Sequence, residues 1–272
     1  MNTTVSLPKI DKPNLTDGPS ITSPISGKEF KIGNGFRALA FRDNDFSSAM
    51  DPLVMVDHYQ MSQPTFGAHP HAGLSAVSVI FEHSEGKLHN RDSLGNDFDI
   101  MAGDLYWLKA GAGVVHDESP RPGSNIHGLQ VFVYLPKTES KSVPASLHVK
   151  AADMPVIKNS GSRVRIVLGE SQGIEGHKSP ALPMTILDGY IEQSSSVLHQ
   201  LSSQENAWIY VVEGEIVVTV GDQEINVSSG KAIAVSKNYR GLEIKLSNLK
   251  NRQSHFAMFS AKPNNETYVH KG

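Results

Sequence analysis

The sequence predicts an all-β protein made of two similar halves. Its 272 residues include 23 glycines and 15 prolines, and few stretches have the periodicity of a helix. Short runs rich in β-branched residues alternate with turn signals about every ten residues, a spacing typical of a sandwich or a small barrel. A chain of this length is long for one domain and suits two domains of about 120 residues each.

The strand candidates of the first half follow a polar segment. Residues 1–20 contain Pro8, Pro13 and Pro19, which predicts a loose arm. Apolar runs then alternate with turns, and a turn at residues 102–104 precedes the run LYWL. The predicted strands cover residues 36–41, 76–81, 105–108 and 126–135.

A change of composition marks the predicted domain junction. Residues 136–160 are polar and contain several prolines, and they lack a clear pattern. We therefore predict an N-terminal domain at residues 1–140, a linker at 141–160 and a C-terminal domain at 161–272.

The second half again reads as a series of strands. Two hairpin turns are predicted within it, at residues 212–215 and 220–223. Its length and texture match those of the first half, which suggests the duplication of one β-barrel. The strand candidates are residues 163–169, 184–191, 196–201, 207–221, 223–227, 231–236, 242–246 and 254–261.

Charge and composition argue against several classes of protein. The formal net charge is −3 and no run of Lys or Arg is present, so nothing favours direct binding to nucleic acid. Cysteine is absent, which excludes disulfides and thiolate metal ligands and fits a reducing compartment. The first 20 residues do not resemble a secretory signal, and no apolar stretch approaches 18 residues. We therefore expect a soluble, cytoplasmic protein without a membrane span.

Two short motifs carry the predicted chemistry. His69-Pro70-His71 places two imidazoles two residues apart, and His116 and Glu118 repeat that spacing with a carboxylate. Residues i and i+2 of a strand face the same side, so neighbouring strands would bring three nitrogens and one oxygen together. Such a set suits a divalent first-row metal.

The spacing alone leaves alternatives open. A His-x-His pair is common by chance, although the glycines around both motifs permit close backbone turns. Four protein ligands on an octahedral ion would leave two positions for substrate or dioxygen, whereas a tetrahedral zinc would leave none.

Longer motifs in the first half resemble the pirin family. They are HPHAG at residues 69–73, GDLYW at 103–107, AGAGVVHDE at 110–118, HGLQ at 127–130 and the Leu-Pro pair at 135–136. The resemblance covers nearly the whole N-terminal half, whereas the C-terminal half is similar only in texture and length.

The resemblance implies a fold, a metal and an activity. The fold would be two cupin (jelly-roll) β-barrels packed face to face, with one mononuclear metal in the N-terminal barrel. Its ligands would be the residues matching the family's positions: His69, His71, His116 and Glu118. Members of the family are described as iron-binding, so iron is the first expectation, with nickel, copper, manganese, cobalt or zinc as alternatives. Some members are quercetin 2,3-dioxygenases and others are regulators that bind partners.

Three functions follow as hypotheses. The first is a dioxygenase that cleaves a flavonol or a related enol with dioxygen, with Glu118 as the catalytic base. The second is a regulatory protein or redox sensor that acts through a protein partner. The third is a purely structural metal. The family often has Phe-Glu where this chain has Leu74-Ser75, which predicts the loss of a carboxylate near the metal pocket and puts the substrate in doubt.

Other residues carry weaker expectations. His58 and His127 either orient a metal ligand or are ordinary buried histidines. Trp107 is expected to be a core aromatic beneath the metal site, with a substrate wall as the alternative. In the second barrel, His199 and His255 lack a His-x-His pair or a matching carboxylate, so this barrel is expected to be metal-free. Four further histidines lie in polar segments and are expected to be exposed: His83, His148, His177 and His270.

Overall fold

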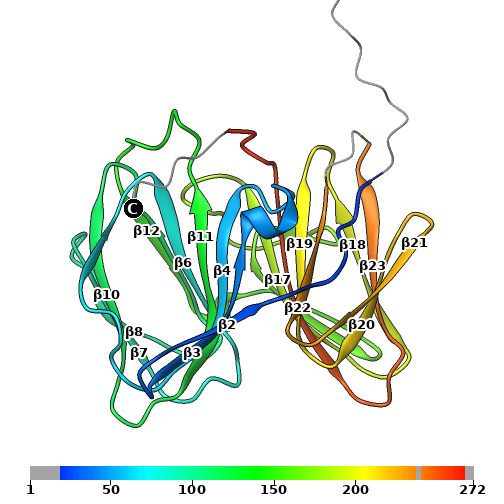
Figure 1. Ribbon diagram of the computed structural model, residues 1–272, viewed down its shortest axis with the longest axis horizontal. Coiled ribbons are helices and arrows are strands. Elements are labelled where there is room, and N and C mark those ends of the chain that lie inside the picture. Colours follow the sequence, from blue (N-terminus) through cyan, green and yellow to red (C-terminus); the bar gives the residue numbers. More distant parts are fainter. Residues whose placement is uncertain (1–18, 237–239, 267–272) are drawn as a thin grey trace, which may run out of the picture.

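The computed structural model describes residues 19–236 and 240–266, which form two β-barrels side by side (Figure 1). The all-β prediction is confirmed, since these residues contain no α-helix and only the 3-10 turns η1 (Asp43–Phe46) and η2 (Ala151–Asp153). No helix among them has the length and hydropathy needed to cross a membrane. The predicted arm lies outside the described residues, except for residues 19 and 20.

The first barrel pairs a seven-stranded sheet with a four-stranded sheet. All pairings within both sheets are antiparallel. In spatial order, the larger sheet contains β12 (Ala145–Val149), β9 (Leu105–Lys109), β6 (Leu74–Ile80), β11 (Ile126–Tyr134), β4 (Leu53–Met61), β3 (Phe36–Arg42) and β2 (Lys28–Ile32). The smaller sheet contains β5 (His69–His71), β10 (Val114–Pro120), β7 (Leu88–Asp92) and β8 (Asp97–Ile100).

The second barrel repeats this plan, with a small extra hairpin. Its larger sheet contains β1 (Ile25–Ser26), β22 (Lys231–Val235), β19 (Asn206–Glu213), β24 (Ser254–Ala261), β17 (Met184–Ile191), β14 (Ser162–Leu168) and β13 (Val156–Asn159). Its smaller sheet contains β18 (Ser195–Leu201), β23 (Leu242–Asn248), β20 (Glu215–Val220) and β21 (Gln223–Ser228), and the hairpin is β15 (Glu170–Ser171) with β16 (Ile174–Glu175).

The domain boundaries stay a prediction. Several segments, however, pair with strands on the other side of a predicted boundary. β1 belongs to the sequence of the first half and yet pairs with β22 of the second barrel. Within the predicted linker at residues 141–160, β12 pairs with β9 of the first barrel and β13 pairs with β14 of the second. The chain beyond β24 returns to the first barrel, where Asn264 donates a hydrogen bond to the Tyr134 carbonyl at 3.0 Å.

One predicted hairpin is present and the other is wrong. β20 and β21 form a hairpin that closes at Val220 and Gln223. At residues 212–215, by contrast, β19 and β20 belong to different sheets, and the chain turns from one to the other at Gly214. Gly214 has a φ of 81°, and a Cβ atom there would lie 2.5 Å from the Ser254 hydroxyl oxygen. The turn residues were recognisable, but the sheet partners of each strand are decided by long-range packing.

A shared apolar core joins the barrels through their seven-stranded sheets. Phe41 and Trp107 of the first barrel and Trp208 and Tyr210 of the second are buried in one continuous cluster. The Phe41 ring lies 5.5 Å from that of Trp208 and 5.2 Å from that of Tyr210, in edge-to-face contacts that favour aromatic packing. Alternate residues of the same strands fill separate cores inside each barrel.

A buried ionic network crosses the same junction. Arg165 of the second barrel is 1% exposed, and its Nη2 lies 2.5 Å from Asp188. Its Nη1 donates to the Gly103 carbonyl of the first barrel at 2.7 Å, and His255 contacts the other Asp188 oxygen at 2.5 Å. Burial by itself would raise the pKa of Asp188, but His255 and Arg165 outweigh it and hold that pKa well below its usual range. The network leaves Asp188 charged within the junction.

Three histidines form a hydrogen-bonded chain beside this network, which we call the histidine relay. The contacts run from Tyr210 to His58 Nδ1, from His58 Nε2 to His127 Nε2, and from His127 Nδ1 to His83 Nε2, each at 2.5 Å. Because a neutral imidazole has one donor and one acceptor, the chain is satisfied with all three rings uncharged. Burial first, and then neighbouring imidazoles, lowers the pKa of His58 to about 3 and that of His127 to about 4.

We expect the substitution Arg165→Met to lower the free energy of unfolding by about 3 kcal/mol or more, because it removes the cation beside the buried Asp188 carboxylate and the donor to the Gly103 carbonyl. Arg163→Gln is the matched control, since Arg163 also crosses the junction, to Glu82 at 2.5 Å, but is partly exposed. That change should cost less than about 1 kcal/mol. Chemical denaturation of the three proteins tests this, and equal losses in both variants would contradict it.

We also expect stability to fall as the pH drops below about 6.5. In the unfolded chain, histidines with pKa values near 6.5 bind protons in this pH range, whereas the relay histidines of the folded protein do not. Each such histidine therefore contributes up to about 1.4 kcal/mol per pH unit to the slope of the unfolding free energy. The measurement is the pH dependence of the unfolding free energy between pH 7 and pH 5, for the wild type and His58→Gln. The variant should show the shallower slope, and identical slopes would refute a role for the relay.

Candidate metal centre

The two predicted histidine motifs lie on neighbouring antiparallel strands. β5 and β10 pair so that His69 is opposite His116 and His71 is opposite Val114. Side chains two residues apart share a face of a strand, which puts all three imidazoles on the inner side of the first barrel. The short β5 carries both His69 and His71, and the chain turns away from it at Gly73, which has a φ of 72°.

The three imidazoles converge on one point. One nitrogen from each of His69, His71 and His116 can be chosen so that all three lie within 4.8 Å of one another. The Nε2 atoms of His71 and His116 are 3.1 Å apart. Two nitrogens bound at right angles to one ion, at about 2.1 Å each, would be about 3.0 Å apart. The donor set therefore fits a single divalent metal.

The protonation of the rings suits metal binding. His69 Nδ1–H donates to the Gly67 carbonyl at 2.8 Å, so its Nε2 carries a free lone pair. Burial, followed by the neighbouring imidazoles, lowers the pKa of both His71 and His116 to about 4. The rings of His71 and His116 are therefore neutral near pH 7, and a neutral imidazole is the form that binds a metal.

Glu118 lines the same pocket but lies outside the group of three. Its Oε2 accepts a hydrogen bond from the Ser78 hydroxyl at 2.7 Å, and its Oε1 is 3.9 Å from His116 Nδ1. Burial raises the pKa of Glu118 to about 7, although the Ser78 hydrogen bond acts in the opposite direction. The structure thus brings three of the four predicted ligands together and holds the carboxylate beside them.

An apolar pocket of about 190 Å³ opens from the imidazoles. Aromatic rings form much of its wall: Phe30 and Phe66 pack on Phe36 with ring centroids 5.5 Å and 5.0 Å away. Phe132 contacts His71 edge to face, at 5.0 Å between ring centroids. Since Phe66 is 40% exposed, it stands at the mouth. Such a pocket favours a flat, largely apolar ligand.

Three polar side chains of the pocket were missed in the sequence. Tyr59 is 3% exposed, and no described residue bonds to its hydroxyl. Asp57 also lines the pocket, where Arg42 contacts it at 2.5 Å, and Gln130 lies directly opposite it on β11. For two of these residues the sequence did contain a signal, the alternation of side chains along residues 53–61. That alternation places Asp57 and Tyr59 on the inner face of the strand, together with Met55.

Two expectations about the pocket are wrong because of the same alternation. Ser75 pairs with Val133, a residue of the shared core, so it faces the junction and not the metal pocket. A glutamate there would not have supplied a carboxylate to the metal. Trp107 is buried as predicted, but it also belongs to the shared core and therefore lies on the opposite face from the metal pocket.

The other histidines have different surroundings. His58 and His127 bond to each other in the relay and do not orient a metal ligand. His148 is half-buried and contacts Asp104 at 2.8 Å, so its predicted exposure is wrong. His83 is exposed, although it bonds to the relay, and His177 is exposed as expected. His270 lies outside the described residues.

The interior of the second barrel is built differently. His199 is buried against the Ser171 hydroxyl at 3.0 Å, and His255 is engaged by Asp188. Among the described residues, no group of three His, Asp or Glu ligands other than the cluster in the first barrel could hold a metal. Aliphatic side chains fill this barrel instead. That it binds no metal stays a prediction.

Comparison with known proteins finds a family match in the first barrel and relatives along most of the chain. Residues 35–133 match the family model described as Pirin, a segment that contains all three clustered histidines and Glu118. Over 259 residues the chain is 25% identical to Pirin of Rattus norvegicus, covering 95% of this chain and 87% of that protein.

Solved structures share the fold over most of the chain. Quercetin 2,3-dioxygenase from Acinetobacter baumannii superposes with a TM-score of 0.80 at 23% identity, over 94% of this chain and 91% of that one. Bacterial pirin YhhW from Escherichia coli, solved in complex with nickel(II), gives a TM-score of 0.66 at 17% identity, over 90% and 99% of the two chains. The chain therefore has the two-barrel cupin fold, carries a pirin family domain in its first barrel, and is a relative of the pirins.

Proposed function

We propose that this protein is a metal-dependent dioxygenase of the quercetin 2,3-dioxygenase type, acting on a flavonol or a related enol. The observation that carries the proposal is the meeting of three clustered imidazoles with an aromatic-lined pocket. The pirin relatives support a shared site, and the quercetin 2,3-dioxygenase neighbour supports a shared fold.

The proposed metal ligands are His69, His71 and His116, with Glu118 as a fourth ligand or an adjacent base. When bound, a divalent ion would supply Lewis-acid chemistry that lowers the pKa of an enol hydroxyl and allows reaction with dioxygen. We propose iron as the native ion. Nickel, copper, manganese, cobalt and zinc remain alternatives, because imidazole nitrogen accepts most of them.

The protein's own groups would hold and prepare the substrate. Glu118, positioned by the Ser78 hydroxyl, is placed to accept the proton of an enol at the pocket floor. The Tyr59 hydroxyl is buried without a partner among the described residues and is available to donate to a substrate carbonyl. Phe36 and Phe132 would exclude water and sandwich the substrate ring.

The volume of the pocket limits the size of the substrate that it could hold. Its volume of about 190 Å³ lies below the range of about 300–1,000 Å³ that is usual for drug-sized ligands. A single-ring enol therefore suits the pocket as it stands. A full flavonol would need Phe66, at the exposed mouth, to swing outwards.

The regulatory alternative also stays a prediction. A redox sensor would change its affinity for a protein partner between Fe(II) and Fe(III) without turnover. A structural metal would leave no open position for substrate, and chelation would lower the melting temperature sharply. The expected cytoplasmic location rests on the sequence alone.

We expect His69→Ala to abolish metal binding and oxygenase activity together, because two imidazoles hold an ion far less tightly than three. Elemental analysis of the purified protein, expressed without added metal, measures the first effect. His89→Ala is the matched control, since His89 lies on the adjacent β7 and bonds to Asp97 instead of the cluster. If His69→Ala kept the metal content of the wild type, the proposed ligand set would be wrong.

We expect Glu118→Gln to retain metal and to lose activity by about 100-fold or more, as when a general base is removed. Oxygen uptake should be followed with quercetin and with single-ring enols, for protein loaded with each candidate metal. Ser78→Ala should lose less activity, because it only releases the carboxylate from its hydrogen bond. The absence of oxygen uptake under every metal would exclude a dioxygenase for those substrates.

A further inference from the structure

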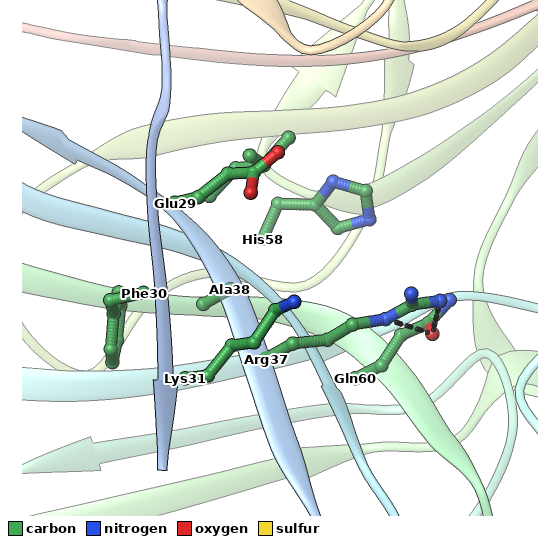
Figure 2. Close-up of a pocket in the computed structure, with 8 residues that line it drawn as sticks. Glu29, Phe30, Lys31, Arg37, Ala38, His58 and Gln60 are labelled. Atoms are coloured by element: carbon green, nitrogen blue, oxygen red, sulfur yellow. Dashed lines mark hydrogen bonds between the residues drawn. The ribbon is translucent and has the colours of Figure 1, made fainter. Parts of the chain in front are cut away.

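A second cleft lies on the outer face of the first barrel, behind the metal pocket. It has a volume of about 310 Å³ and is formed on β2, β3 and β4 (Figure 2). His58 and Gln60 face this cleft, whereas Asp57 and Tyr59 of the same strand face the metal pocket. The two cavities therefore lie on opposite faces of one sheet.

Two rows of side chains run across the three strands and build the cleft. In one row Lys31 is directly opposite Arg37, and Arg37 is directly opposite Gln60. In the other row Glu29 is directly opposite Leu39, and Leu39 is directly opposite His58. A cleft assembled from cross-strand neighbours is fixed by the register of the sheet and needs no loop to form it.

The first row holds an unfavourable pair of charges. Lys31 and Arg37 are like charges directly opposite one another, an arrangement that destabilises a pair of strands. Neither side chain has an ion-pair partner among the described residues, although Glu29 lines the same cleft. The same two cations also border an adjoining hollow of about 330 Å³. Two uncompensated cations beside a cavity favour an anion between them.

The guanidinium of Arg37 is already oriented for such an anion. Gln60 Oε1 accepts hydrogen bonds from Arg37 Nε, at 2.8 Å, and from Nη2. Figure 2 shows these bonds and shows the Lys31 side chain running alongside Arg37. The Nη1 group and the outer edge of Nη2 remain available, and this planar edge matches a carboxylate or a phosphate. A donor held in place loses less entropy when the ligand binds.

We propose that this cleft binds a small organic anion, with its carboxylate or phosphate group between Arg37 and Lys31 and its apolar body against Leu39. Leu39 lines the cleft beside the two cations, so the ligand is more than a bare inorganic ion. His58, the end of the relay, forms part of the wall. The site is separate from the metal ligands and does not depend on the proposed oxygenase activity.

The test is titration calorimetry of the full chain with benzoate, phenyl phosphate and uncharged benzamide. We expect saturable binding of at least one of the two anions and none of benzamide. Arg37→Gln should weaken that binding about 10-fold or more, as expected for the loss of charge-assisted hydrogen bonds. Glu29→Gln should tighten it, because it removes the one like charge facing the anion.

Two control variants test whether the anion binds in this cleft or elsewhere on the protein. Lys28→Gln removes a cation from the same strand that does not line the cleft, and it should leave the affinity unchanged. His71→Ala disables the metal cluster and should also leave it unchanged. Absence of saturable binding by both anions would overturn the proposal. So would binding that survives Arg37→Gln or disappears in His71→Ala, since the anion would then occupy another site.

Discussion

Both barrels depend on the alternation of side chains along seven-stranded sheets whose central strands are buried on both faces. In the first barrel, Val77 and Val79 point into the shared core while Ser78, between them, points at the metal pocket. The sheet therefore has to satisfy two interiors at once, and a shift of register by one residue would exchange them. This constraint places the metal pocket on one face, and it places the relay and the anion cleft on the other.

Arg165 and the relay bring polar groups into the junction, and some of their hydrogen-bond partners lie in the opposite barrel. Arg165 reaches Gly103 across the interface, and Tyr210 meets His58. Removing either barrel would leave these groups buried without a bond or exposed to water, so the pairing gives the interface an orientation as well as stability. An apolar interface alone is not directional, whereas hydrogen bonds between the two sheets favour one arrangement.

The metal pocket combines a compact donor set with a small, largely apolar cavity. Three imidazoles on two adjacent strands leave one side of the cluster open to the pocket, where Glu118 and Tyr59 offer a proton acceptor and a proton donor. These are the groups that proton abstraction from an enol requires. The aromatic wall limits the shape of a ligand that the pocket can hold, and burial, followed by the neighbouring imidazoles, lowers the pKa of His71 and His116.

The sequence by itself determined the all-β class, the repeated barrel and the three clustered histidines, because these follow from periodicity and local spacing. It could not assign the partners of β19 and β20, the face of Ser75 and Trp107, or the partner of His255. Each of those depends on contacts between residues far apart in the chain. Asp188 is 67 residues from His255, and Tyr210 is 152 residues from His58, yet each pair is in contact. The pairing of β17 with β24 inside the second barrel brings Asp188 to His255, and the packing of one barrel on the other brings Tyr210 to His58. A local sequence pattern specifies neither contact, because each joins residues far apart in the chain.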